Sequence, residues 1–244
     1  MKKMTQLAAA IALASGALVA TPAMAEDKLA VSANAGFVTE YYYRGQELGD
    51  AGAYGGVDAE FGGFYAGMWA IDDGNDTDDG GLEVDFYAGY GFEFENGLSL
   101  GLGYTRYEYT YSSVYEDEWV LSAGFKGFAV EYANGEDNND DKDDDLYNTV
   151  DEEYDYDFWA VSYSGDIFGI KYGSYEADLD TVNAKNEYDY IEISASGEVV
   201  GLDVSATLGK KRNVKVNDGT LLQDEEGSGD GYFVIDVSKS FDLM

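Results

Sequence analysis

The connections between the apolar stretches of the sequence alternate in length. Brief connections lie at 61–64, 95–97, 125–128, 164–166 and 197–201. Longer, mostly acidic connections lie at 45–52, 72–80, 111–117, 135–153, 176–186 and 210–230. A soluble sandwich of two β-sheets has no reason to carry its long loops at every second connection, whereas a membrane β-barrel keeps short turns on one side and long loops on the other. The alternation therefore favours an all-β, transmembrane antiparallel up-and-down barrel.

Between these connections, hydrophobicity alternates with a period of two. Residues 82–94 are the clearest case, because the even positions are apolar and the odd positions are acidic, Gly or Tyr. Such a pattern predicts a strand with one face in an apolar medium and the other in water. The same alternation predicts twelve strands, at 29–44, 53–61, 64–71, 82–94, 98–110, 118–126, 128–134, 154–164, 167–175, 187–196, 202–209 and 231–241. A soluble periplasmic sandwich also alternates, so the loop lengths distinguish the two architectures.

The N-terminal segment has the pattern of an export signal. Lys2 and Lys3 precede an apolar run at 7–20, and Ala23-Met24-Ala25 is an A-x-A cleavage site. We therefore expect residues 1–25 to be a secretory signal peptide and residues 26–244 to form the barrel domain. No apolar run of about twenty residues follows, so no membrane-spanning helix is expected.

The charge balance is strongly acidic. The expected signal holds two of the 14 basic residues and none of the 49 acidic ones, so the remainder carries 12 basic residues, 49 acids and a net charge of −37. Such a surface repels nucleic acid and attracts cations, although solubility in a saline habitat explains it equally well.

Catalysis is largely excluded by composition. The sequence contains no His and no Cys, which rules out His-dependent triads, His-based zinc sites and thiol chemistry. Carboxylate pairs such as Glu83 and Asp85 are compatible with glycosidic chemistry, but chance pairs are expected among so many acids. We therefore expect neither an enzyme nor a cofactor.

Alternation also predicts which charged residues face the barrel lumen. These are Glu40, Arg44, Asp58, Glu60, Glu83, Asp85, Glu93, Glu131, Lys171, Glu192, Asp203 and Asp236, with Arg106 as a further basic candidate. Without Arg106, acids outnumber bases ten to two in this set, which favours cations if the lumen holds water. The sequence thus predicts a passive, cation-leaning diffusion channel for small solutes. In the alternative, the charges pair with one another in a closed barrel, and its acidic extracellular loops bind a surface partner or divalent cations.

Three weaker patterns lie near the long loops. Asp72, Asp73, Asp76, Asp78, Asp140 and Asp141 are candidate cation ligands, although their loops do not match an EF-hand. Lys210, Lys211, Arg212 and Lys215 form a basic cluster that either contacts lipopolysaccharide phosphates or compensates nearby acids. Twelve tyrosines lie near the strand ends that the long loops connect, which are expected to be extracellular, and predict an interfacial aromatic girdle: Tyr41, Tyr42, Tyr43, Tyr107, Tyr109, Tyr111, Tyr154, Tyr156, Tyr172, Tyr175, Tyr188 and Tyr190.

Several segments resemble a known family. Residues 32–45 (SANAGFVTEYYYRG) resemble the opening strand of the TorF-family porins of proteobacteria, and residues 64–69, 82–90 and 237–241 resemble later strands of that family. The resemblance implies a pore in the outer membrane of a Gram-negative bacterium, in contact with membrane lipid and lipopolysaccharide. It implies no catalytic residue. A homo-oligomer is compatible with the sequence, because lipid-facing and subunit-facing leucines have the same pattern.

Overall fold

A computed structural model describes residues 28–72, 81–112, 114–139, 154–179, 184–217, 225–227, 229 and 231–244. Its strands are β1 (Ala30–Val38), β2 (Tyr41–Tyr43), β3 (Gln46–Gly49), β4 (Gly52–Phe61), β5 (Phe64–Asp72), β6 (Leu82–Glu93), β7 (Leu98–Tyr109), β8 (Val114–Phe125), β9 (Phe128–Asn139), β10 (Tyr154–Ser164), β11 (Phe168–Leu179), β12 (Ala184–Val199), β13 (Leu202–Asn217), β14 (Glu225–Gly227) and β15 (Gly231–Asp242). Among these residues, no helix has the length and apolar character needed to cross a membrane.

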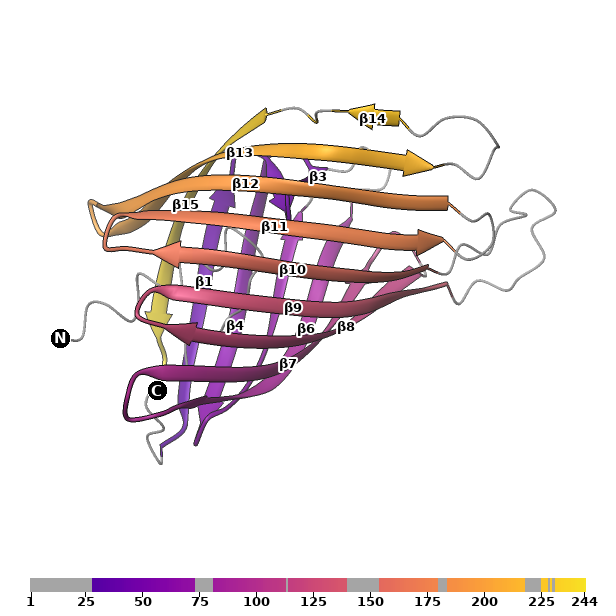
Figure 1. The fold of residues 1–244 in the computed structure, drawn as a ribbon. Helices are drawn as coiled ribbons and strands as arrows, with labels where there is room; N and C mark the ends of the chain where they lie inside the picture. The colour runs from indigo at the N-terminus through magenta and orange to yellow at the C-terminus, as the bar shows by residue number, and fades with distance from the viewer. Residues whose placement is uncertain are drawn as a thin grey trace.

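Twelve of the strands form one closed antiparallel barrel (Figure 1). From β4 to β13 each strand pairs with the next along the chain, and β15 and β1 complete the ring between β13 and β4. Closure leaves no free strand edge. The predicted twelve-stranded antiparallel barrel is therefore confirmed.

The two ends of the barrel differ in their connections. Both ends of the described chain lie at the end that carries the short turns, and the strand ends that the longer connections join lie at the opposite end (Figure 1). Three of the short turns, Gly62-Gly63, Lys126-Gly127 and Val200-Gly201, have positive φ at both residues. That backbone is typical of two-residue hairpins whose twist matches the flanking strands. The alternation of connection lengths thus corresponds to the two ends of the barrel.

Several strands extend further than their hydrophobic pattern predicts. β8 begins at Val114 instead of residue 118, β9 continues to Asn139, and β12 and β13 have 16 residues each. The predicted loops at 111–117, 135–153, 176–186 and 210–230 are therefore partly strand. Apolar alternation detects a strand only where its outer face is apolar, whereas the backbone ladder continues through the polar residues beyond.

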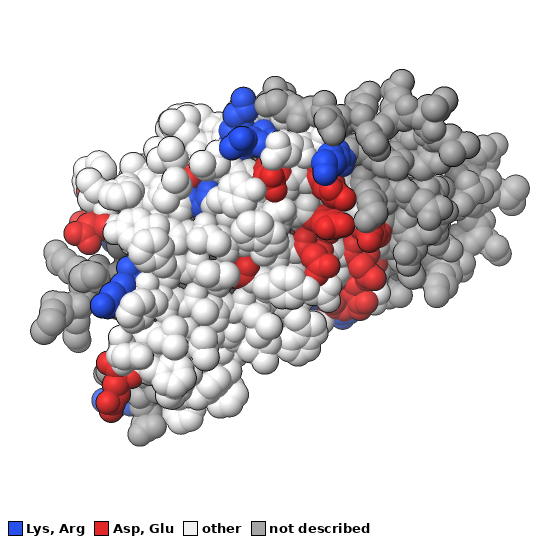
Figure 2. All heavy atoms as spheres, viewed as in Figure 1, with Lys and Arg blue, Asp and Glu red and all other residues white. Residues whose placement is uncertain are grey.

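The barrel has an apolar outer face and a polar, aromatic inner face. Phe64, Trp119 and Leu208 are 64%, 57% and 61% exposed, whereas Glu118 and Phe158 are 1% and 0% exposed. Figure 2 shows a broad area with few charged residues on one side of the barrel, with acidic residues gathered beside it toward the long-loop end. This distribution is the reverse of that in a soluble globular protein.

Candidate functional site

The first long connection folds into the barrel as a hairpin. The predicted strand at 29–44 is wrong at its C-terminal end, because β1 stops at Val38 and β2 pairs with β3 to form a separate two-stranded sheet. Arg44 and Gly45 form the tip, with φ of 50° and 79°. A Cβ atom on Gly45 would lie 2.6 Å from the Cβ of Tyr190, so the tip packs closely against β12. We call Tyr41–Gly49 the inner hairpin.

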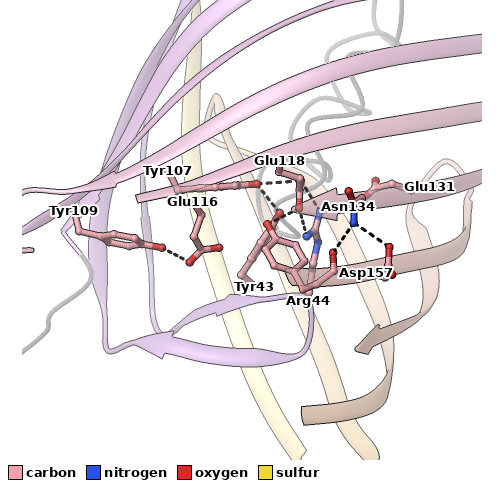
Figure 3. Close-up of polar contacts among 10 residues, drawn as sticks. Tyr43, Arg44, Tyr107, Tyr109, Glu116, Glu118, Glu131, Asn134 and Asp157 are labelled. Carbon is pink, nitrogen blue, oxygen red and sulfur yellow. Dashed lines mark hydrogen bonds and ion pairs between the residues drawn. The ribbon is translucent and has the colours of Figure 1, made fainter. Parts of the chain in front are cut away.

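Arg44 crosses the lumen and binds the opposite wall (Figure 3). Its Nη2 donates to Oε1 of Glu118 at 2.9 Å and its Nη1 donates to the other carboxylate oxygen. Nη2 also lies 3.6 Å from Oε1 of Glu131. The guanidinium carbon lies 4.1 Å from the ring centre of Phe158 and 4.6 Å from that of Tyr43. Since β9 and β10 lie opposite β1 and β4 in the strand order, the inner hairpin spans the bore.

Tyrosine hydroxyls complete the hydrogen bonding around Glu118. Tyr156 and Tyr107 donate to its two oxygens at 2.9 Å and 3.3 Å. The hydroxyls of Tyr43 and Tyr107 lie 2.8 Å apart and share a hydrogen bond. Figure 3 shows the rings of Tyr43 and Tyr107 and the Arg44 side chain converging on the carboxylate of Glu118. Glu118 therefore accepts from two arms of a guanidinium and from two phenols, which satisfies a buried carboxylate well.

The charges at the hairpin tip stabilise one another. Burial lowers the pKa of the Arg44 guanidinium, but the negative charge of Glu118 and the hydrogen bonds to Glu118 outweigh this effect and hold that pKa well above its usual value. Burial also raises the pKa of Tyr43, so its hydroxyl stays protonated. The tip is thus a buried ion pair whose separation leaves an unpaired charge in the protein interior.

A second group of contacts fixes the base of the inner hairpin. Tyr41 donates from its hydroxyl to Oε1 of Glu83 at 2.7 Å. The ring of Tyr42 stacks on that of Tyr232, with centroids 3.9 Å apart and planes inclined by 13°. β2 therefore contacts β6 and β15, in addition to the contacts of the hairpin tip with the far wall.

Most of the predicted lumenal residues lie on the inner face. Glu83, Asp85, Glu131, Lys171, Glu192 and Asp236 are buried there. Asp58, Asp236 and Glu192 accept hydrogen bonds from the hydroxyls of Tyr87, Tyr54 and Tyr232. Glu60 and Asp203 are half-buried, and each lies two strand positions from a residue that faces inward, so both face the lumen as well. The ammonium of Lys171 lies 5.7 Å from the ring centre of Phe158.

Glu40, Glu93 and Arg106 differ from the rest of that set. Glu40 is half-buried in the bend between β1 and β2, and Glu93 is exposed at the short-turn end of β6. Arg106 is a correction, because it lies between the buried Thr105 and Tyr107 and so faces outward. Its Nε donates to Asp117 at 2.9 Å, and its side chain is 37% exposed.

The predicted tyrosine girdle is wrong for most of its members. Tyr107, Tyr156, Tyr188 and Tyr190 are buried within the barrel, where several of the tyrosine hydroxyls bind carboxylates. Tyr172 is outward, with its ring 5.5 Å from that of Trp159. Strand parity turns these four rings inward, toward the lumen.

The candidate lipopolysaccharide contacts and cation ligands near the long loops do not form one site in the described residues. Lys211 places its ammonium 3.8 Å from the ring centre of Tyr188, on the inner side, whereas Lys210 and Arg212 are exposed and Lys215 lies 3.3 Å from Glu187. Asp72 is exposed at the end of β5, and the candidate ligands Asp73, Asp76, Asp78, Asp140 and Asp141 lie outside the described residues. In the described part of the chain, no group of three acidic side chains is arranged to hold a metal ion.

Two residues of the candidate site are not among the predicted lumenal residues. Glu116 and Glu118 belong to β8 and face inward, although the hydrophobic pattern places residues 111–117 in a loop. Their signal is the alternation of Glu116, Glu118 and Val120, which becomes visible only if the strand is extended N-terminally through Asp117.

One protein family matches the sequence of this chain. A family described as a bacterial protein of unknown function, Gcw_chp, matches residues 22–167. No curated protein is significantly similar in sequence.

Among solved structures, the COG4313 outer membrane channel from Pseudomonas putida F1 is similar, with 9% identity and a TM-score of 0.52 over 88% of this chain and 95% of that one. The NanC porin has 8% identity and a TM-score of 0.49, over 88% of this chain and 100% of that one. OccAB1 of Acinetobacter baumannii has 11% identity and a TM-score of 0.48, over 84% of this chain and 60% of its own length. The COG4313 channel supports the same barrel fold, and at these identities the likeness extends to nothing beyond the fold.

None of these matches tests the resemblance to the TorF family, which stays a prediction. Because the family match covers more than half of the 244 residues, the chain belongs to the Gcw_chp family of bacterial proteins.

Proposed function

We propose that this protein is an outer-membrane channel of a Gram-negative bacterium that passes small solutes passively and favours cations. The observation that carries the proposal is the apolar belt on the outside of a closed barrel whose inner face is charged. Exposed apolar side chains such as Trp119 and Leu208 are shielded from water if membrane lipid covers this belt, which is favourable. A barrel with this distribution is suited to a membrane.

The inner face supports a preference for cations. Buried acids such as Glu83, Asp85 and Glu192 outnumber the buried bases Arg44 and Lys171. A lumen with this balance attracts cations and repels anions. The inner hairpin narrows the passage and makes its tip the natural constriction.

The proposal includes the features that link the barrel to its membrane. Residues 1–25, which lie outside the described residues, direct export and are removed. The long loops face the cell exterior, where the exposed Lys210 and Arg212 contact lipopolysaccharide phosphates. These features agree with membership of a TorF-type group of porins and with a homo-oligomer in the membrane.

Two experiments test the channel. Detergent-extracted protein should migrate differently on a gel before and after heating, as closed barrels do, and it should give conductance steps in a planar lipid bilayer. Reversal potentials under a salt gradient should show a preference for cations. The absence of steps, or a preference for anions at low salt, contradicts the proposal.

The second candidate is a closed barrel whose acidic loops bind a surface partner or divalent cations. The inner hairpin favours it, because Arg44 is bound across the bore to Glu118 and Glu131. Folded, heat-modifiable protein without conductance, both as wild type and after removal of the hairpin tip contact, supports this candidate over the channel.

A further inference from the structure

The wall formed by β6, β7 and β8 carries carboxylates that alternate with tyrosines. In the strand register Glu83 lies opposite Tyr109, Asp85 lies opposite Tyr107, and Tyr107 lies opposite Glu116. Glu83, Asp85 and Tyr107 are buried on the inner face, at 3%, 6% and 8% exposure. One row across the wall therefore reads carboxylate, phenol, carboxylate.

One oxygen in this row has no hydrogen-bond donor. Tyr109 donates to Oε1 of Glu116 at 3.1 Å, and Tyr41 donates to Oε1 of Glu83. In the described part of the chain, Oδ1 of Asp85 is buried without a hydrogen-bond partner. Arg44, the basic residue at the hairpin tip, is bound to Glu118 and Glu131 instead. A buried carboxylate oxygen in this state is unfavourable unless a ligand or a water molecule supplies the donor.

The spacing of the acids suits an organic cation better than a metal ion. Neighbouring strands lie about 4.8 Å apart, so the backbones at Asp85 and Glu116 are roughly 10 Å apart. Accordingly, no three acidic side chains of the described chain are close enough together to hold a metal. A guanidinium or primary ammonium group brings several N–H donors and is also attracted to the faces of phenol rings.

Arg44 and Glu118 provide an internal example of this chemistry. There the same barrel holds a guanidinium with both oxygens of one carboxylate and with aromatic rings on either side. Asp85 lies on the same wall, two strands away from Glu118. It is next to Tyr107, whose hydroxyl donates to the carboxylate of Glu118. A carboxylate and neighbouring phenol rings, the kinds of group that hold Arg44, are thus also present at Asp85, where no basic side chain of the described residues is bound.

We propose that Asp85, flanked by Glu83 and Glu116 and by the rings of Tyr107 and Tyr109, binds the guanidinium or primary ammonium group of an organic cation. The site deepens the proposed function, on which it rests for the arrival of the ligand through the lumen. It assigns the solute class as small organic cations that carry N–H donors.

Titration of the folded full-length barrel in detergent tests the site without any conductance measurement. By calorimetry, methylguanidinium and methylammonium should bind saturably at millimolar concentration, and tetramethylammonium, which has no N–H group, should bind at least tenfold more weakly. Asp85→Asn should weaken methylguanidinium binding at least tenfold, whereas Glu93→Gln, at the exposed end of the same strand, should leave it unchanged. Asp85→Glu should retain part of the affinity.

Each outcome decides the proposal. Absence of saturable binding to the wild type, equal binding of tetramethylammonium, or unchanged affinity in Asp85→Asn overturns it, and the comparison of the three cations on the wild type decides even if that variant does not fold. Binding without bilayer conductance retains the site and contradicts the channel. Conductance without binding retains the channel and contradicts the site.

Discussion

Replacing Arg44 by Ala tests whether the hairpin tip constricts the bore. The substitution removes the paired hydrogen bonds to Glu118 and the contact with Glu131, and it leaves both carboxylates buried beneath a hairpin with no cation. Breaking a buried ion pair on one side destabilises the structure that contains it by about 3–5 kcal/mol. Here that structure is the docked inner hairpin, because undocking returns the carboxylates to water without opening the barrel.

The remaining contacts decide whether the hairpin stays docked. The charged hydrogen bond from Tyr41 to Glu83 contributes about 1.5–3 kcal/mol and the stacking of Tyr42 on Tyr232 about 0.5–1.5 kcal/mol. Their sum is comparable to the loss at Arg44. We therefore expect the docked and undocked hairpins of the variant to be similarly populated, whereas the wild type is docked.

Two assays measure the change. Backbone amides of Tyr41–Gly49 should exchange with solvent about 10²- to 10⁴-fold faster in Arg44→Ala, with unchanged exchange in the barrel strands, and bilayer conductance should increase. Arg106→Ala is the matched control, because Arg106 pairs with Asp117 on the outer face at partial exposure. Equal exchange of the hairpin amides in the two variants would refute the assigned role of Arg44.

Glu118→Gln combined with Arg44→Ala separates the charge from the packing. If the unpaired carboxylate causes the undocking, the double variant should recover part of the hairpin protection lost in Arg44→Ala, because no buried charge is left opposite the tip at that position. Protection as low as in the single variant would instead assign the effect to the lost contacts of the guanidinium with its neighbouring rings.

Three further predictions concern the same lumen and its rim. Glu83→Gln with Asp85→Asn should reduce cation preference, measured as a shift of the reversal potential toward zero under a salt gradient, since both carboxylates are buried on the inner wall. Gly45→Ala should destabilise the docked state of the inner hairpin by about 1–3 kcal/mol, because φ is 79° and the new Cβ would meet the ring of Tyr190. Amide exchange of the hairpin measures this change. Lys210→Ala should lower the affinity for lipopolysaccharide by about 1 kcal/mol at low salt, as an exposed cation would, and an unchanged affinity would remove this residue from the proposed contact.

The barrel was predictable because its signals are local. Alternation at residues 82–94 predicts the faces of β6 correctly, with Phe86 and Phe92 exposed and Glu83 and Asp85 buried. The short connections were likewise visible as Gly-containing turns. The strand ends were not, since polar residues such as Glu116 on β8 continue the backbone ladder beyond the apolar belt and carry no hydrophobic signal.

The inner hairpin is the part of the site that local patterns misassign. Residues 29–44 alternate well enough to suggest one long strand, and no residue in that stretch marks the break after Val38. What separates the hairpin from the wall is a set of contacts distant in sequence, from Arg44 to Glu118 and from Gly45 to Tyr190. Inward folding is therefore decided by the far wall of the barrel.

The same contacts explain why so many tyrosines gather at one end of the barrel. A buried carboxylate needs donors, and a protonated phenol supplies one without adding a charge. Glu118 accepts hydrogen bonds from the guanidinium of Arg44 and from phenols. Elsewhere on the inner face, Glu192 and Asp236 accept hydrogen bonds from the hydroxyls of Tyr232 and Tyr54. A lumen built in this way keeps its negative charge while holding its side chains in place. In the proposed channel, that combination lets an acidic wall remain both ordered and attractive to cations, which neither a cluster of unpaired acids nor a fully ion-paired interior achieves.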